Sequence, residues 1–365
     1  MRPFRRRPFG RPVPARGTSR YTAGMRTLEV TKLRDLTGPG HTDEYGIGGT
    51  DLGAAATAPD GRIVAVFGDT FESKEAGGPG WRSPVILFGD PDSVRSGLRW
   101  TGAAGPSRGY ADQVVSYRHN ARIGGRFGGL IGGTRITTQL PTDLITVGDT
   151  MYLHVMACEG LGNVHWTEIH RSRDNGVSWE STGLSWPGGH LGGHFQMLTW
   201  ELGPDGYVYA LTTGFQRDKG LLLHRVPADH LLDAAAWEGW GFADGAWAWG
   251  NAPTPVLPGA FGELSLRRVG DTWWLCAFDA GNYRIDLIPM PGGPTTDLTT
   301  AERLTVVSGC GWGEEDHGCG RVAQLYGGYI LPGSTPDEMH LVVSQWHTNE
   351  NWPYRAMHFR ARLAV

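Results

Sequence analysis

Short apolar runs that follow turn signals recur along the chain, mostly about 60 to 90 residues apart. Each run follows a turn built from Gly, Asp, Pro, Ser or Thr and is rich in β-branched, aliphatic and aromatic residues, which is typical of strands buried on both faces of a sheet. The five runs are 63–67, 151–157, 207–212, 273–278 and 339–346. Helical periodicity is weak, and its best example is the short stretch 227–240.

Five irregular all-β units predict a five-bladed β-propeller, in which small sheets pack radially around a channel. We expect residues 25–365 to form this single propeller domain and residues 1–24 to form a separate basic arm. The alternative architecture for the same strands is a pair of β-sandwiches.

A turn motif supports the propeller. Residues Ser172 to Trp179 match the Asp-box pattern Ser-x-Asp-x-Gly-x-x-Trp. In such turns the Asp, here Asp174, binds the turn backbone, and the Trp, here Trp179, packs between blades. We assign the motif a structural role, because Asp-boxes normally lie away from an active centre.

The composition and charge of the chain argue against several classes of function. The 56 glycines and 15 tryptophans, without a Gly-X-Y period, indicate many short strands and tight turns. The net charge of −4 argues against a general nucleic-acid binder. No apolar run approaches the roughly 18 residues of a membrane span, so we expect no membrane insertion. No pattern predicts a cofactor.

The first 24 residues have a different composition from the rest of the chain. They contain seven arginines, four prolines and no acidic residue. They lack the apolar stretch of a secretory signal, and also the one that should follow a twin-Arg signal. The interpretations are a disordered basic arm, an attachment segment or a misassigned start.

The four cysteines fall into two pairs. Cys158 and Cys276 lie near the ends of apolar runs and are expected to be buried thiols. Cys310 and Cys319 flank a polar loop and would form a local disulfide if the protein works outside the cell. A metal site formed by these two residues and His317 is the alternative, but the spacing matches no common zinc pattern, so no metal is predicted.

Two carboxylates stand at the ends of a predicted hairpin. Asp51 lies in the glycine-rich stretch 48–53, and Asp69 closes the apolar run 64–71. Between them, residues 59–61 form a Pro-Asp-Gly turn. If this hairpin is the innermost pair of strands in its sheet, both acids reach the same end of the sheet. The alternative is that each Asp only caps a turn.

Further polar and aromatic residues stand where other inner strands would begin or end. Asp143 and Glu263 begin such strands, so in a propeller they would meet Asp51 and Asp69 at the mouth of the channel. Aromatic rings near carboxylates suit sugars, whose apolar ring faces stack on them. Candidate substrate-binding residues are Asp143, His165, Trp166, His194, Gln345 and Trp346. Core packing is the alternative for each aromatic, and it is favoured for Trp273 and Trp274.

Several of these motifs together resemble the domain of unknown function 4185 family, whose members include endo-D-arabinanases of glycoside hydrolase family 183. The motifs are Gly49-Thr50-Asp51-Leu52-Gly53, Phe67-Gly68-Asp69-Thr70, Pro141-Thr142-Asp143, Gly262-Glu263-Leu264-Ser265 and Ser344-Gln345-Trp346. The similarity runs over roughly residues 28–363.

The resemblance implies a five-bladed propeller that cleaves the α-linked D-arabinofuranose chains of mycobacterial-type arabinogalactan and lipoarabinomannan. It carries Asp51 and Asp69 over as the family's acids, and Asp143 and Glu263 less directly. It also implies an extracellular, envelope-facing or virion-associated protein. The basic arm would then serve as the attachment to a phage tail or cell-envelope assembly.

Glycoside hydrolysis needs one carboxylic acid to protonate the leaving oxygen and one carboxylate to activate water or attack carbon. Acids on different strands favour the wider separation that accompanies inversion. The sequence interpretation takes Asp51 as base and Asp69 as acid or pKa partner, with Glu263 as the competing acid.

Three other functions remain open. A non-catalytic carbohydrate-binding propeller, such as a phage tail receptor-binding protein, would keep the aromatics and could lose an acid. A sialidase would need an arginine cluster and a Tyr-Glu pair, and no pattern selects three of Arg82, Arg122, Arg135 and Arg321. A structural tail or envelope protein would use only the scaffold.

Overall fold

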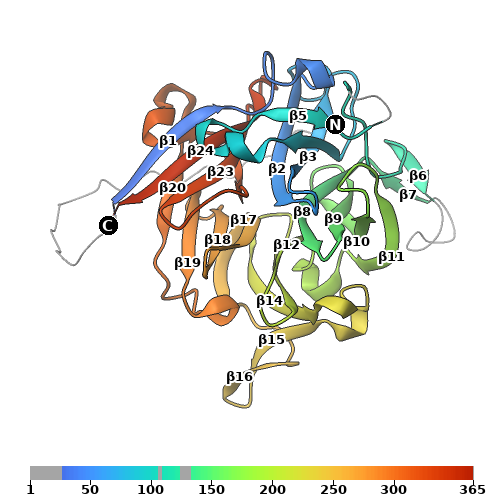
Figure 1. Cartoon of the computed structure of the whole chain (residues 1–365). Helices are drawn as coiled ribbons and strands as arrows, with labels where there is room; N and C mark the ends of the chain where they lie inside the picture. Colours follow the sequence, from blue (N-terminus) through green and yellow to red (C-terminus); the bar gives the residue numbers. More distant parts are fainter. Residues whose placement is uncertain (1–26, 106–108, 124–132, 365) are drawn as a thin grey trace.

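The structure, a computed structural model, describes residues 27–105, 109–123 and 133–364. Within these residues the strands form three four-stranded sheets, one ten-stranded sheet and one two-stranded sheet. The larger sheets are arranged radially about the middle of the molecule (Figure 1). The all-β prediction is confirmed. The basic segment 1–24 lies outside the described residues. No helix in the described part of the chain is long and apolar enough to cross a membrane.

The first two sheets are antiparallel meanders in chain order. The first contains β2 (Gly49–Thr57), β3 (Ile63–Phe71), β4 (Val85–Gly89) and β5 (Trp100–Ala103). The second contains β8 (Thr138–Val147), β9 (Thr150–Glu159), β10 (Asn163–Ser172) and β11 (Glu180–Pro187). A small hairpin lies between them in sequence, formed by β6 (Ala121–Ile123) and β7 (Thr134–Ile136).

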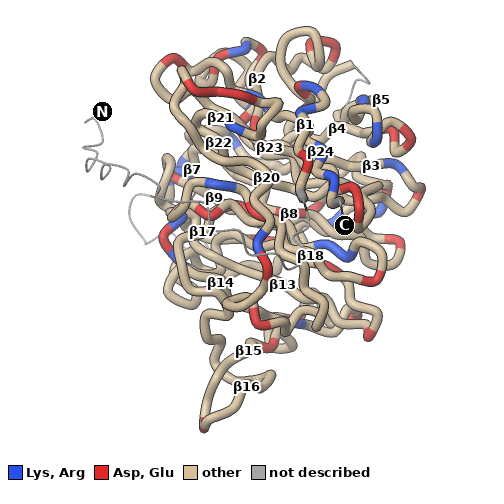
Figure 2. Tube along the Cα trace, turned by 90° about the vertical axis from the view of Figure 1, so that its left-hand side faces the viewer, with Lys and Arg blue, Asp and Glu red and all other residues tan. Residues whose placement is uncertain are grey.

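The ten-stranded sheet consists of two groups. The first group contains β12 (Met197–Leu202), β13 (Tyr207–Thr213), β14 (Lys219–Pro227), β15 (Glu238–Ala243) and β16 (Ala246–Trp249). The second contains β17 (Leu257–Val269), β18 (Thr272–Asp279), β19 (Arg284–Met290), β20 (Leu304–Cys310) and β21 (Arg321–Ala323). Only the pairs Lys219↔Phe261 and Leu221↔Leu257 join the groups, through β14 and β17. The hairpin β15–β16 projects from the body in both views (Figure 1, Figure 2).

The remaining sheet combines both ends of the described chain. It contains β22 (Leu325–Ile330), β23 (Glu338–Trp346), β24 (Tyr354–Ala364) and β1 (Thr27–Asp35). Strand β1 pairs antiparallel with β24, from Thr27↔Ala364 to Asp35↔Met357. The first strand of the described chain therefore completes a sheet that the last strands begin.

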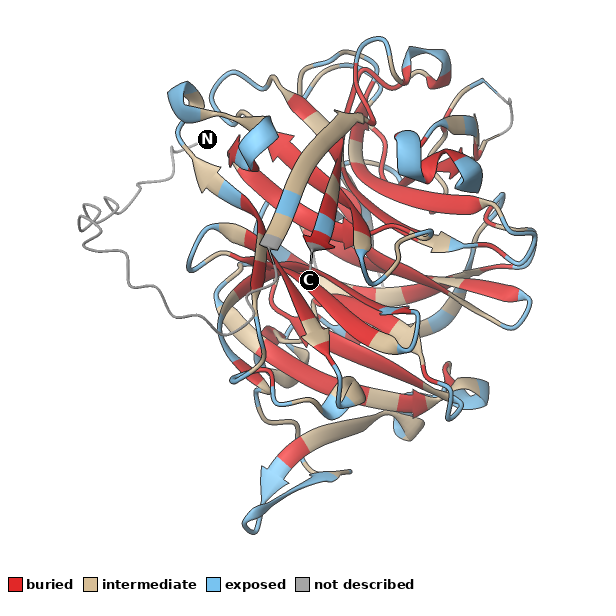
Figure 3. Ribbon diagram, turned by 60° about the vertical axis from the view of Figure 1, so that its left-hand side comes forward, coloured by how far each residue is buried: buried red, intermediate tan, exposed pale blue. Residues whose placement is uncertain are grey.

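The first strands of the sheets and strand groups surround a common centre. In cyclic order β2, β8, β12, β17 and β22 each contact the next, and β22 contacts β2. The apolar runs predicted from sequence supply the buried surfaces between the sheets (Figure 3). Four of these inner strands carry a register shift, namely β2, β8, β17 and β22. A bulge bends its strand and re-aims side chains, and it often lies next to an active site.

The Asp-box turn between β10 and β11 has the predicted structural role. The Oδ1 atom of Asp174 accepts a hydrogen bond from the Ser178 backbone N–H at 2.9 Å, and the Trp179 indole N–H donates to the Gly176 carbonyl at 3.1 Å. A Cβ on Gly176 would lie 3.0 Å from Val64 of β3. The turn therefore packs tightly against the neighbouring sheet.

The helix suggested for 227–240 is wrong. The stretch forms two single 3₁₀ turns, Ala228–His230 and Ala234–Ala236, and then enters β15. Its alanines and leucines imitate helical spacing over too few residues to nucleate a helix, because helices this short are marginal in water.

Candidate functional site

Asp51 and Asp69 lie at the same end of the first sheet, as the hairpin prediction required. Thr50 pairs with Thr70 and Leu52 with Phe67, so Asp51 occupies a bulge opposite Gly68 and Asp69. Leu52 adopts a φ of 65°, a left-handed conformation that a non-glycine residue seldom takes. The bulge thus turns Asp51 out of the ordinary strand alternation, at a cost in backbone strain.

The Asp51 carboxyl is held by a tyrosine from β22, the inner strand next to β2 in the ring. The hydroxyl of Tyr326, in β22, donates to Asp51 Oδ2 at 2.7 Å. The other oxygen, Oδ1, is buried without a hydrogen-bond partner among the described residues. Gly68 is required beneath it, because a Cβ at that position would overlap Oδ1.

Burial raises the pKa of Asp51 to about 7, and the nearby charge of Asp69 adds to the rise, whereas the Tyr326 hydrogen bond opposes it. Asp51 therefore holds its proton up to neutral pH.

The neighbouring Asp69 has donors that favour its ionised form. The indole N–H of Trp81 donates to Asp69 Oδ1 at 2.8 Å, and the hydroxyl of Thr138, in β8, donates to the same oxygen at 2.5 Å. Burial raises the pKa of Asp69, while the Thr138 and Trp81 hydrogen bonds lower it. The hydroxyl of Tyr354 donates to the Asp69 backbone carbonyl at 2.9 Å and fixes the end of the strand.

Glu263 lies in the bulge of β17, and Arg217 connects it to Tyr326, the residue that binds Asp51. We call Asp51, Asp69 and Glu263 the carboxyl cluster. Arg217 Nη2 donates to Glu263 Oε1 at 2.5 Å, and the Gly327 backbone N–H lies 3.4 Å from Oε2. The Arg217 guanidinium also lies over the Tyr326 ring, 5.2 Å from its centroid, and over the Phe278 ring at 5.3 Å. The tyrosine that binds Asp51 therefore packs against the cation that binds Glu263.

The three acids occupy different electrostatic settings. Asp51 is buried beside the charge of Asp69, Asp69 has two neutral donors, and the buried Glu263 has a cation. Carboxyl groups whose environments separate their proton affinities are the usual arrangement for general acid–base chemistry. A protonated Asp51 can deliver a proton, and an ionised Asp69 can accept one.

Asp143 differs from the prediction. It is fully buried and forms a two-point ion pair with Arg267, at 2.5 and 2.8 Å. Thr199 Oγ1 also donates to it at 2.7 Å. The bulge between Pro141 and Asp143 turns the carboxylate inward, between β8, β12 and β17. Asp143 therefore stabilises the ring of inner strands and is closed off from a polysaccharide.

The next three predicted residues lie in the second sheet and the loop after it. His165 is partly buried in β10, with Nε2 3.2 Å from Glu159 Oε2. Trp166 follows it in β10 and is also partly buried. His194 lies in the loop before β12, with Nδ1 3.0 Å from the Leu191 carbonyl oxygen. These contacts are local to the second sheet and its loop, so the role of the three residues in binding stays a prediction.

The last two predicted residues are adjacent in β23 and have different surroundings. Gln345 is buried, donates to Glu315 and accepts from Arg355 at 2.9 Å, so its amide serves an internal network. The ring of Trp346 lies 5.8 Å from that of Tyr354, the residue that binds the Asp69 backbone. Trp346 therefore packs against a tyrosine that contacts the end of the strand carrying Asp69.

Sequence reasoning missed the residues that hold the carboxyls in place. Tyr326, Tyr354, Trp81, Thr138 and Arg217 come from five separate parts of the chain. Only one weak signal was available, the pair of glycines directly after Tyr326, which marks the bulge of β22.

The model of one family, described as a domain of unknown function (DUF4185), matches residues 37–360. The chain belongs to the DUF4185 family. It is 29% identical over 338 residues to an uncharacterised 35.9 kDa protein of Mycolicibacterium smegmatis, covering 87% of this chain and 93% of that protein. It is also 29% identical over 344 residues to notoamide biosynthesis cluster protein J′ of Aspergillus versicolor, covering 89% and 88% of the two chains.

Solved structures with a similar fold come from proteins of low identity. A candidate hydrolase from Bacteroides ovatus has a TM-score of 0.58 at 16% identity, covering 92% of this chain and 90% of that one. A GH43_1 enzyme from Xanthomonas citri in complex with xylotriose has a TM-score of 0.52 at 11% identity, covering 91% and 90%. The β-xylosidase RS223 has a TM-score of 0.51 at 10% identity, covering 86% and 92%. At these low identities the similarities show that this DUF4185 chain shares a fold with those proteins, and nothing further.

The cysteine predictions have two outcomes. Cys158 and Cys276 are buried free thiols, as expected, and burial raises the pKa of both. Cys310 and Cys319 are also free thiols, so the local disulfide is not formed. Within the described residues no group of three or more His, Cys, Asp or Glu side chains is placed to hold a metal ion.

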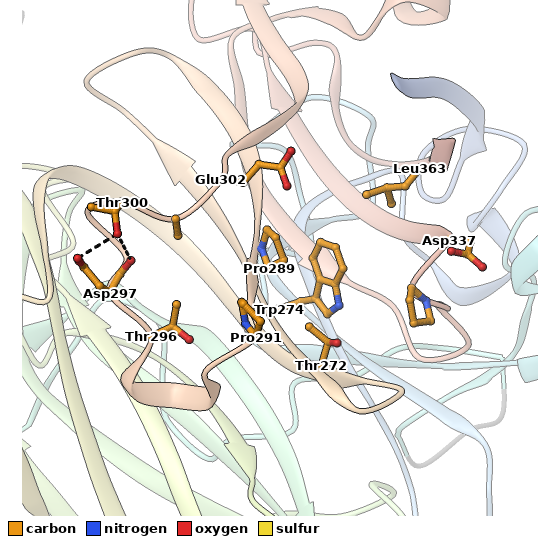
Figure 4. Close-up of a pocket in the computed structure, with 12 residues that line it drawn as sticks. Thr272, Trp274, Pro289, Pro291, Thr296, Asp297, Thr300, Glu302, Asp337 and Leu363 are labelled. Carbon is orange, nitrogen blue, oxygen red and sulfur yellow. Dashed lines mark hydrogen bonds between the residues drawn. The ribbon is translucent and has the colours of Figure 1, made fainter. Parts of the chain in front are cut away.

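A pocket of about 440 Å³ lies at the other end of β17 and β18 from Glu263 (Figure 4). Its lining includes Trp274, Pro289, Asp297 and Asp337, and none of the predicted site residues. Trp274 is 2% exposed, which confirms its predicted place in the core. The pocket is therefore separate from the carboxyl cluster.

Proposed function

We propose that this chain is a glycoside hydrolase that cleaves α-linked D-arabinofuranose chains of mycobacterial-type arabinogalactan and lipoarabinomannan internally, as an endo-D-arabinanase. The observation that carries the proposal is the Asp51–Asp69 pair, in which burial and the charge of Asp69 raise the pKa of Asp51 to about 7. The substrate class rests on the family resemblance of the motifs around these two acids.

We also infer that the radial sheets are the five blades of a propeller. Five inner strands contact one another in cyclic order, which supports one blade for each of them. The ten-stranded sheet then counts as two blades, because only two residue pairs join β14 to β17. Such a ring gathers the ends of its inner strands at one mouth, where an extended polymer can lie across them.

In the proposed reaction Asp51 is the general acid. Its raised pKa keeps the carboxyl protonated, and the hydrogen bond from the Tyr326 hydroxyl to Oδ2 fixes the orientation of the carboxyl. Asp51 transfers its proton to the leaving glycosidic oxygen as the bond to the anomeric carbon breaks. This order of roles reverses the one suggested by sequence, which made Asp51 the base.

Asp69 is the proposed base. Trp81 and Thr138 both bind its Oδ1, so Oδ2 is the oxygen that can take a proton from the attacking water. The water oxygen bonds to the anomeric carbon, and inversion of configuration stays the prediction. Glu263, paired with Arg217, holds in place the guanidinium that packs on the ring of Tyr326, the tyrosine that binds Asp51.

The test is incubation of the purified full chain with mycobacterial arabinogalactan, with products followed by chromatography and mass spectrometry. We expect a ladder of arabinose oligomers. Asp51→Asn and Asp69→Asn should each lower the rate by about 10²- to 10⁴-fold, the usual contribution of a general acid or base. Asp229→Asn, at a carboxylate with 82% of its side chain exposed, is the matched control.

The other outcomes of this test are informative. Retention on the polysaccharide without products would move the assignment to a carbohydrate-binding propeller. Release of sialic acid from a sialylated substrate, with no arabinose oligomers, would point to a sialidase. If the protein is not retained on the polysaccharide and no products form, the family shares the fold with this chain but not the substrate. An arabinan substrate would place the protein outside the cell, at the envelope or on a virion, with the basic arm 1–24 as the proposed attachment to a phage tail or envelope assembly.

A further inference from the structure

The hairpin β15–β16 separates its residues by size. Directly opposed pairs across the two strands are Trp240↔Trp249 and Phe242↔Trp247, and paired residues lie on the same face. These four residues form what we call the aromatic face. The positions that alternate with them are all Gly or Ala, at 239, 241, 243, 246, 248 and 250.

The face made of small residues is covered by the chain that follows the hairpin. A Cβ on Gly239 would lie 2.8 Å from Pro253, and a Cβ on Gly241 would overlap the carbonyl oxygen of Ala252. The Phe242 backbone N–H donates to Thr254 Oγ1 at 3.0 Å and holds the covering segment in place. Larger side chains are excluded from this face, so the aromatic rings have to point away from it.

The base of the aromatic face is anchored and its tip is open. The Arg225 guanidinium lies 4.4 Å from the centroid of the Trp249 ring, and the Tyr209 ring lies 5.8 Å from it. Toward the tip, Phe242 is 51% exposed and Trp247 is 41% exposed. The rings of Trp240 and Trp247 stack, with centroids 6.1 Å apart and planes 18° apart. Figure 3 shows the exposed tip at the lower edge of the molecule.

Charge argues against a membrane as the occupant. Segment 238–254 contains no Lys or Arg, and its two acids are Glu238, which is paired with Arg225 at 2.7 Å, and Asp244 at the turn. Figure 2 shows the hairpin without a basic residue. Aromatic segments that bind anionic lipid surfaces depend on basic residues around them. A neutral ligand suits this surface.

Size argues against a protein partner. An aromatic side chain buries about 150 to 250 Å², so the exposed parts of Phe242 and Trp247 together offer on the order of 200 Å². A stable protein interface buries about 800 Å² on each partner. The open rings are large enough for one or two sugar units.

We propose that the aromatic face of β15–β16 is a second binding site, at which the apolar faces of neutral sugar rings stack on Phe242 and Trp247. It is separate from the carboxyl cluster, since the hairpin extends the outer edge of its sheet beyond β14, whereas Asp51 and Glu263 lie on inner strands. The identity of the sugar polymer as arabinan rests on the proposed function, whereas the site itself does not. A role in holding a long glycan while the inner strands act on it also rests on the proposed function.

The test is affinity gel electrophoresis of the full chain through gels containing mycobacterial arabinogalactan, L-arabinan or xylan. All proteins carry Asp51→Asn, so that the polymers stay intact. Phe242→Leu with Trp247→Leu keeps apolar volume and removes the rings, and Trp247→Phe keeps a ring. The control is Leu161→Ala, which removes an apolar side chain 68% exposed elsewhere on the surface.

We expect retardation in at least one gel, weakened about tenfold or more by the double leucine variant. Trp247→Phe should recover part of it, and Leu161→Ala should match the parent protein. Equal retardation of all variants, or no retardation in any gel, would overturn the proposal. So would a double variant that changes only self-association in sedimentation, because the occupant would then be a second copy.

The outcome is distinguishable from that of the proposed function. Hairpin-dependent retardation without hydrolysis by the unmodified chain would keep this site and overturn the hydrolase. Hydrolysis with retardation independent of the hairpin would keep the hydrolase and overturn this site.

Discussion

Replacing Asp51 with Asn should make the protein more stable at neutral pH while removing its proposed activity. The Asn side chain has the same shape and keeps an oxygen that can accept the Tyr326 hydroxyl, which now lies 2.7 Å from Asp51 Oδ2. The substitution removes the ability to ionise and replaces one carboxyl oxygen with an amide NH₂ group, a change whose own effect on stability does not vary with pH. Its effect on stability should therefore depend on pH in a way that reports the environment of this one carboxyl.

The magnitude follows from two pKa values for Asp51, the ordinary 3.8 of an aspartate carboxyl and about 7 in the folded chain. Between these values the folded chain holds a proton that the unfolded chain has released, so stability falls as pH rises from about 4 to about 7. About three pKa units at 1.36 kcal/mol each give roughly 4 kcal/mol. Partial exposure of the side chain makes this an upper value. The Asn variant has no ionisable group at this position, so it does not lose this stability.

The assay is urea unfolding followed by tryptophan fluorescence, for the parent chain and Asp51→Asn, from about pH 4 to about pH 8. The difference in unfolding free energy should grow in favour of the Asn variant by about 2 to 4 kcal/mol across that range. Asp229→Asn, at an exposed carboxylate, is the control for the chemistry of the substitution. A constant difference for Asp51→Asn, or one that shrinks as pH rises, would refute the reasoning.

The remaining predictions concern the partners of the carboxyls and the state of the cysteines. Tyr326→Phe removes a hydrogen bond to the ionised carboxylate, so the pKa of Asp51 should rise further by about one unit, measured by carboxyl ¹³C NMR titration, and an unchanged titration would contradict the contact. Asp143→Asn leaves Arg267 buried without its partner and should cost about 3 to 5 kcal/mol in unfolding free energy, with the rate per folded molecule unaffected; a loss of rate without a loss of stability would make Asp143 a site residue after all. Reducing agent should leave the melting temperature unchanged, because all four cysteines are free thiols, and a lowered melting temperature would reveal a disulfide.

Local signals in the sequence predicted the parts of the site that lie on one hairpin. Asp51 and Asp69 flank a Pro-Asp-Gly turn, so their shared end follows from antiparallel pairing alone. The Asp-box was equally local, since Asp174 and Trp179 act within a single turn. Turn chemistry and strand alternation determine such features over a few residues.

Contacts between residues far apart in the sequence could not be predicted from the sequence. Tyr326 is 275 positions from Asp51, and Arg267 is 124 positions from Asp143. Whether Asp143 faces a substrate or an arginine depends on the side to which a bulge turns it, and one sequence does not encode that in any local pattern. The glycines at 327 and 328 marked a bulge without indicating that the tyrosine before it, Tyr326, binds an acid.

The pairing of β1 with β24 has a mechanical consequence. Thr27 and Ala364 are opposite each other, so both ends of the described chain leave the sheet at one point. A pull that separates the two ends would load the hydrogen bonds of this pair one after another, as in opening a zipper, instead of all at once. The ring of sheets thus has a seam that would open from one end, and opposing pulls on β1 and β24 would strain it, whereas a pull on one of them would not separate the pair at its open end.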